Sequence, residues 1–150
     1  MNNNNQNDTN STVVEMEEKA PCYYFSLRIW VKEENYRKID EILGVKSNHN
    51  YSNWWILEYI NREEDEYVPY IEKFLSILEG KYEQLAEIGI QRDNISIREL
   101  YAYDSQCNME FSPKLMYALG KEGITLCISC WDEHDYEADE LQYKNTQINN

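Results

Sequence analysis

This chain of 150 residues lacks several features on which common enzyme classes depend. Its five glycines are scattered, so none of the glycine-rich loops that hold nucleotide phosphates is present. The two histidines do not form an H-E-x-x-H pattern, and no G-x-S-x-G sequence marks a hydrolase nucleophile. No apolar run approaches the ~20 residues that a membrane-spanning helix requires. These absences argue against phosphate-loop enzymes, zinc proteases, serine hydrolases and helical membrane proteins.

Cysteine is also scarce, and four residues are not the density of a disulfide-linked scaffold. The first ten residues, MNNNNQNDTN, have neither the basic region nor the apolar core of a secretory signal. We therefore expect a cytoplasmic protein. The chain carries no cofactor-binding motif, so we expect no cofactor.

Basic residues are outnumbered two to one, because 14 Lys and Arg stand against 28 Asp and Glu. The net charge of −14 argues against binding to nucleic acid and to anionic membranes. More than half of that excess lies in residues 1–20 and 132–150, whose polar, aperiodic composition predicts a disordered Asn-rich tail and an acidic C-terminal tail. Between them, residues 21–131 hold 18 acidic and 12 basic residues and are long enough for one domain.

Two kinds of periodicity divide this domain into elements. Alternation of apolar and polar residues predicts strands at 24–31, 53–60, 94–103 and 124–131. A helical period follows Asn35, Pro69 and Pro113, and Gly80 is expected to bend or split the second of these helices. The third helix has the clearest boundaries, with Ser112 as its N-cap and Gly123 at its exit.

The order of these elements predicts an α+β fold in a single domain. We expect a four- to five-stranded, mostly antiparallel sheet with helices packed on one face, built from two βαβ-like halves. The segment 107–111 is a candidate for a short additional strand.

Three segments carry the most distinctive patterns of the domain. They are FSLRIW at 25–30 leading to IDEILGV at 39–45, SNWWILEY at 52–59, and FSPKLMYALGKEGITLCISCW at 111–131. Together they resemble the bacterial family known as domain of unknown function 4279, over roughly residues 22–131. The resemblance implies a small α+β domain without an established activity. Members of such families often lie among toxin immunity genes, so it also implies an immunity role, but it supplies no catalytic residues.

The cysteines at 127 and 130 form a C-x-x-C pattern on a predicted strand. Residues three apart on a strand point to opposite faces, with Cα atoms roughly 10 Å apart, so neither a disulfide nor shared zinc ligation suits them. We expect a structural role, with Cys130 inward and Cys127 on the other face. No metal site is predicted.

Glu99 interrupts the apolar face of the third predicted strand. A β-bulge that turns this side chain toward solvent would explain the interruption. The alternative is a buried acid with a raised pKa, which would be a candidate functional residue. We expect the bulge.

One face of the predicted sheet gathers aromatic and charged residues. If Phe25, Leu27 and Ile29 face the helices, the opposite face carries six candidate partner-binding residues: Arg28, Trp30, Trp54, Glu58, Arg98 and Trp131. Exposed tryptophans beside arginines are the composition of a binding hot spot. Alternatively, the tryptophans cover the sheet against a loop, and Glu58 neutralises an arginine.

These features predict a non-catalytic protein-binding domain, as an immunity-type inhibitor that binds a cognate bacterial toxin. A basic toxin encoded nearby would suit the acidic charge, with the acidic loop Glu63–Glu66 as an adjoining contact. One alternative is a small-molecule-binding or enzymatic domain that uses the Trp/Arg face as a pocket. Another is a regulatory protein with a peptide partner. No oligomeric state is predicted.

Overall fold

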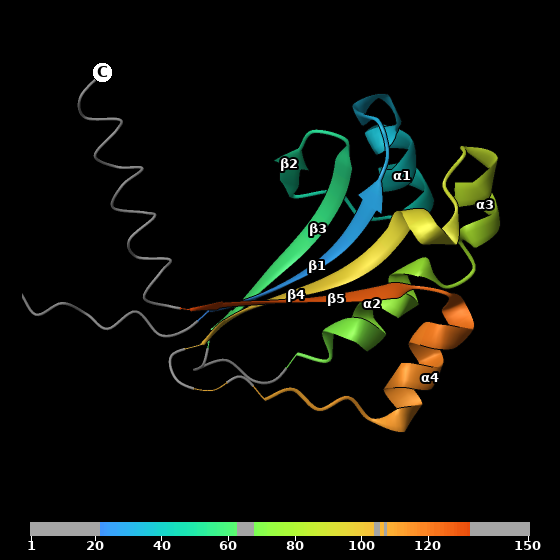
Figure 1. The fold of residues 1–150 in the computed structure, drawn as a ribbon. Coiled ribbons are helices and arrows are strands. Elements are labelled where there is room, and N and C mark those ends of the chain that lie inside the picture. Colours follow the sequence, from blue (N-terminus) through green and yellow to red (C-terminus); the bar gives the residue numbers. More distant parts are fainter. Residues whose placement is uncertain (1–21, 63–67, 104–105, 107, 133–150) are drawn as a thin grey trace, which may run out of the picture.

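The computed structural model describes residues 22–62, 68–103, 106 and 108–132, which form one sheet and the helices that cover it (Figure 1). The strands are β1 (Cys22–Trp30), β2 (His49–Tyr51), β3 (Trp54–Arg62), β4 (Ile95–Tyr103) and β5 (Thr125–Asp132). The α-helices of this part of the chain are α1 (Tyr36–Leu43), α2 (Tyr70–Leu78), α3 (Tyr82–Glu87) and α4 (Pro113–Glu122), with short 3-10 turns at Glu33–Asn35 and Arg92–Asn94. The predicted α+β class is confirmed.

The sheet is mostly antiparallel, with the strand order β2-β3-β1-β4-β5. Strand β1 is antiparallel to β3 and to β4, β2 is antiparallel to β3, and only β4 and β5 run parallel. The unit β4-α4-β5 is therefore a βαβ unit, as predicted for the second half. The first half differs, because β3 lies between β1 and the short strand β2, and it runs opposite to both.

The additional strand was predicted in the wrong place. It is β2, which lies between the first predicted helix and the strand predicted at 53–60, whereas residues 108–111 form neither helix nor strand and residue 107 is outside the described ranges. Strand β2 has only three residues, too few to show a period.

The helices cover one face of the sheet, and the other face is left without a helix in the described part of the chain (Figure 1). On the covered side, Leu27, Ile29, Trp55 and Ile97 are buried to 0% exposure. Buried residues of the helices pack against them: Ile39, Leu43, Ile71, Phe74, Leu78, Leu85 and Leu119. Phe25, Leu27 and Ile29 thus face the helices, as the sequence predicted.

Helix boundaries follow local chemistry at most of the predicted positions. The side chain of Ser112 accepts a hydrogen bond from Leu115 N at 3.2 Å, Pro113 begins α4, and Gly123 ends it with a φ of 66°. Gly80, with a φ of 71°, separates α2 from α3, so the long predicted helix is split there. Asn35 occupies the position before α1, as predicted, but its side chain makes no capping hydrogen bond.

An indole hydrogen bond joins α1 to the sheet. Trp55 Nε1 donates to Asp40 Oδ1 at 2.7 Å, and the same oxygen accepts from Ser47 N at 3.1 Å. One carboxylate therefore satisfies the buried indole and holds the turn that follows α1.

Several predictions fall outside the described residues. These are the tails at 1–20 and 133–150 and the acidic loop Glu63–Glu66. Within the described ranges, none of the helices is long and apolar enough to cross a membrane.

Candidate functional site

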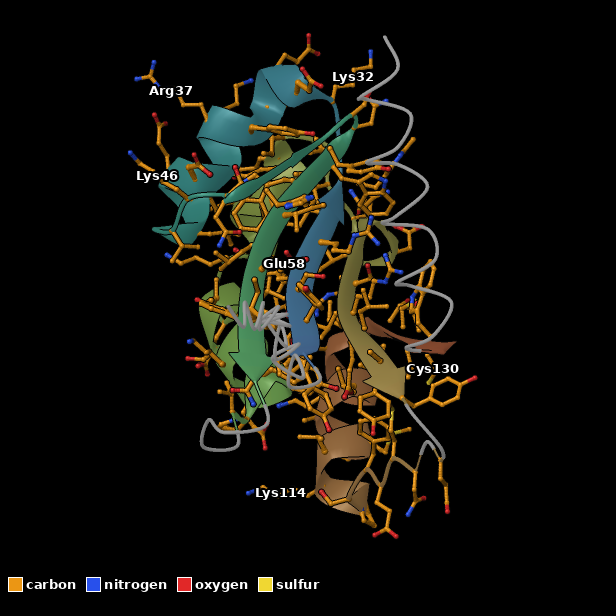
Figure 2. The ribbon with its side chains drawn as sticks, turned by 90° about the vertical axis from the view of Figure 1, so that its left-hand side faces the viewer. Lys32, Arg37, Lys46, Glu58, Lys114 and Cys130 are labelled. Atoms are coloured by element: carbon orange, nitrogen blue, oxygen red, sulfur yellow. The ribbon has the colours of Figure 1, made fainter. Side chains whose placement is uncertain are left out.

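The sheet side without helices, which we call the open face, is defined by the strand register. Residues that are Cα partners across antiparallel strands point the same way, so the alternate residues of all five strands share this face. Figure 2 looks onto it, with Glu58 near its centre. All six candidate partner-binding residues lie at open-face positions: Arg28, Trp30, Trp54, Glu58, Arg98 and Trp131.

Five of these six residues come together in adjacent rows of the sheet. Trp30 pairs with Trp54, and the guanidinium of Arg28 lies 4.5 Å from the centre of the Trp54 ring. Ser26 pairs with Glu58 on one side and with Arg98 on the other. The five therefore form one continuous surface over β3, β1 and β4.

Trp131 does not join that surface. It pairs with Ala102, which is four residues beyond Arg98 along β4 and so about 13 Å away. Trp30 lies at the opposite end of the sheet. The two exposed tryptophans, with exposures of 56% for Trp30 and 43% for Trp131, thus mark separate ends of the open face.

Three of the gathered residues, Arg28, Glu58 and Arg98, line a cavity of 240 Å³, which we call the arginine pocket. Its polar and aromatic lining comes from β1, β2, β3 and β4: Tyr24, Ser26, Arg28, His49, Tyr51, Glu58 and Arg98. Ile56, which is 4% exposed although it lies on the open face, forms part of the apolar lining. A cavity of this size accommodates one side chain or one small ion.

Both arginines of the pocket have an unsatisfied buried nitrogen. Nε of Arg28 and Nε of Arg98 are buried, and neither has a hydrogen-bond partner among the residues that the structure describes. Burial, and next the charge of Arg98, lowers the pKa of Arg28 below its ordinary value, while Cys127, Glu58 and Tyr51 act against this shift. The pocket thus holds positive charge that is incompletely compensated.

Glu58 does not pair with either arginine in the described structure. Its Oε1 lies 3.8 Å from Nδ1 of His49, and its backbone exchanges two hydrogen bonds with the Asn48 side chain, at 2.7 and 2.8 Å. The alternative in which Glu58 neutralises an arginine by an ion pair is therefore not what this structure shows. Within the described part of the chain, Arg98 forms one hydrogen bond, from Nη2 to Ser129 Oγ at 3.1 Å.

Ser26, His49 and Tyr51 also line the pocket, although they were not predicted as site residues from the sequence. Ser26 looks like an ordinary polar residue of an alternating strand, yet it is only 4% exposed, because it lies on β1 between Glu58 of β3 and Arg98 of β4. His49 and Tyr51 lie on β2, whose pairing with β3 brings them to the rim. The only sequence pattern that could have indicated a strand here is the alternation of His49 and Tyr51 with Asn50. Three residues are too few to establish a strand period.

A second polar feature, the contact between Tyr70 and Glu99, lies on the covered side. The register of β1 and β4 runs without interruption through Phe25 and Glu99, so the predicted bulge is wrong. Glu99 is 8% exposed, and Tyr70 OH donates to its Oε2 at 2.5 Å. The Tyr70 ring stacks on Phe25 with centres 4.2 Å apart.

Burial raises the pKa of the Glu99 carboxyl, and the hydrogen bond from Tyr70 partly offsets that effect. The two residues border a cavity of 200 Å³ near Phe111 and Tyr101. A carboxyl with a raised pKa is a candidate general acid. Its contact with Tyr70 also joins α2 to β4, and no described residue beside it offers a nucleophile paired with a base.

The two cysteines of β5 point to opposite sides, as predicted, because Cys127 pairs with Arg98 and Cys130 with Tyr101. The expected burial of Cys130 is wrong, since both side chains are exposed. Strand β5 is at the edge of the sheet and has a neighbour on one side only. In the described ranges, no three His, Cys, Asp or Glu side chains are grouped as metal ligands.

No family model matches the chain, and no match was found among the curated proteins or the solved structures. The resemblance to the family of unknown function 4279 therefore stays a prediction.

Proposed function

We propose that this chain is a non-catalytic protein-binding domain that receives its partner on the open face of the sheet. The observation that carries the proposal is the distribution of exposed apolar side chains. Six large ones are exposed among the described residues, and four of them lie on this face: Trp30, Tyr51, Ile60 and Trp131. Aromatic residues around a central arginine are enriched where partners bind.

Charge supports a particular kind of partner. The chain is strongly acidic, which increases the association rate of a basic partner and disfavours acidic competitors. An immunity-type inhibitor of a basic bacterial toxin has these requirements, because it must capture its toxin quickly and hold it. The resemblance described above points to the same role.

Coexpression with the product of a neighbouring gene tests this proposal. A tagged copy of the chain is expected to purify with that product in a fixed ratio and to relieve its toxicity. Trp30→Ala should weaken the complex by about 2 kcal/mol or more, mainly through faster dissociation. Rising salt should mainly slow association.

Tyr117→Ala is the matched control, because Tyr117 is 72% exposed on α4, away from the open face. It should leave the complex unchanged. Equal losses from Trp30→Ala and Tyr117→Ala would show that the open face is not the docking surface. A neighbouring product that neither binds nor is toxic would contradict the immunity role.

The arginine pocket supports a second candidate, a domain that binds a small anionic molecule. The supporting observation is the 240 Å³ cavity with its two incompletely paired arginines. This function predicts that the purified protein retains or turns over a metabolite and needs no protein partner. Mass spectrometry of denatured, freshly purified protein would detect such a molecule.

A further inference from the structure

The arginines with described side chains divide into two classes by their partners. Arg37 on α1 forms an ion pair with Glu41 at 3.1 Å, and Arg92 forms one with Glu122 at 3.0 Å. Arg28 and Arg98, in contrast, form no ion pair with any described residue, although they are the two with buried nitrogens that lack a partner. The chain has twice as many acidic as basic residues, yet the one carboxylate that lines the pocket with these two arginines, Glu58, forms an ion pair with neither of them.

Both guanidinium groups are held in place by neighbours that do not neutralise them. Arg28 lies over the Trp54 ring, and Arg98 is tied to Ser129. Such contacts fix the direction of an arginine while leaving donors available. Preorganised donors in a half-buried cavity bind an anion at lower cost than flexible surface arginines do.

The charges that line the pocket define the ligand. Two arginines and one glutamate leave one net positive charge when His49 is neutral. A carboxylate carries one negative charge and matches this balance, whereas a doubly charged phosphate exceeds it and is repelled more strongly by Glu58. Carboxylate oxygens also suit the planar donor geometry of a guanidinium.

We propose that the arginine pocket receives the carboxylate of an aspartate or glutamate side chain from the protein partner. This inference rests on the proposed function, and it adds the chemistry of the anchor. The partner is then basic overall, which suits the acidic body of this chain, but it presents one acidic residue to Arg28 and Arg98. The exposed Trp30 and Tyr51 beside the pocket contact the residues that surround this anchor.

The Nε–H signals of Arg28 and Arg98 in NMR spectra of the full chain provide a direct test. The probe is N-acetylglutamate N-methylamide, which models a glutamate side chain in a polypeptide. Its neutral control is N-acetylglutamine N-methylamide, and its cationic control is N-acetyllysine N-methylamide. We expect saturable shifts of both Nε–H signals with the glutamate probe only, at constant ionic strength.

Three variants distinguish binding in the pocket from a general effect of charge on binding of the probe. Arg98→Gln should weaken binding of the glutamate probe at least tenfold, and Arg37→Gln, which removes the same charge from α1, should leave it unchanged. Arg98→Lys keeps the charge but not the planar donor group, so it should also weaken binding. Unchanged backbone spectra away from β1, β4 and β5 confirm that each variant is folded.

Several results would overturn the inference. These are the absence of a saturable shift, equal binding of the glutamine probe, or equal loss from Arg37→Gln. Tighter binding of inorganic phosphate than of the glutamate probe would also overturn it, in favour of the small-molecule function. If a partner binds and Trp30→Ala weakens the complex while Arg98→Gln does not, the proposed function stands and the carboxylate anchor is wrong.

Discussion

The two faces of the sheet are made from alternate residues of the same strands, so their differences do not arise from backbone structure. On the covered face, Leu27 and Trp55 are completely buried against helices. On the open face, their chain neighbours Arg28 and Trp54 stack on each other beside a cavity. One face removes apolar area from water, which stabilises the fold. The other keeps exposed rings and charged donors that contribute little to it.

This contrast helps to distinguish residues that serve binding from residues that serve folding in a small domain. A residue of the covered face is explained by the core that it fills. The unpaired nitrogens of Arg28 and Arg98 are not explained in that way, because leaving a buried donor without a partner costs free energy. Their presence is understandable if a ligand supplies the missing acceptor.

The largest expected difference in unfolding free energy between the two faces is between adjacent residues of β1. Leu27→Ala should lower the free energy of unfolding by roughly 2–5 kcal/mol, because it leaves a cavity in the core. Arg28→Ala, one residue away, should cost about 1 kcal/mol or less. Urea denaturation of both variants measures the difference, and the reverse order would mean that the faces are assigned wrongly.

The adjacent tryptophans of β3 allow the same comparison between the two faces with a smaller substitution, tryptophan to phenylalanine. Trp55→Phe loses the hydrogen bond to Asp40 and part of a buried ring, so it should cost about 1–3 kcal/mol. Trp54→Phe should cost under about 1 kcal/mol, since its ring lies on the open face. Thermal unfolding of the two variants checks this, and equal losses would contradict it.

Glu99 is a charged residue on the otherwise apolar covered face, and its contribution to the stability of the fold should depend on pH. Because the folded state raises the pKa of this carboxyl, its contribution to stability is complete below the ordinary value of 4.5 and decreases as pH rises through the raised pKa. Glu99→Gln keeps an acceptor for Tyr70 without the charge. The variant should therefore become more stable relative to the parent chain as pH rises from acidic to neutral.

Denaturation over that pH range measures this difference, with Glu72→Gln on the exposed surface of α2 as the matched control. A difference that does not change with pH would show that Glu99 remains charged without cost in the folded chain.

Much of the fold could be predicted from local patterns. Alternation located β1, β3, β4 and β5, and the cap and glycine signals located α4. The open-face positions of Arg28 and Arg98 followed from the same alternation. These features depend on residues close together in the chain, which is why one sequence was sufficient.

The features that were not predicted from the sequence depend on contacts between segments that are distant in the chain. The burial of Glu99 requires Tyr70, which is 29 residues away, and the position of Trp131 requires the register of β4 with β5. The pocket needs β2 beside β3, although β2 is too short to show a period. A sequence pattern assigns a residue to a face, but pairing determines which residues on that face meet.

The central claim is that the arginines of the open face serve binding and not folding, and the unfolding free energy of Arg98→Met tests it most directly. Methionine keeps much of the arginine's volume and removes its charge. If Arg98 is retained for a ligand, the variant should be within about 1 kcal/mol of the parent chain or more stable, as often happens when an apolar side chain replaces a buried charge. A loss of about 3–5 kcal/mol, the cost of breaking a buried ion pair, would show that Arg98 holds the fold together and would contradict the account.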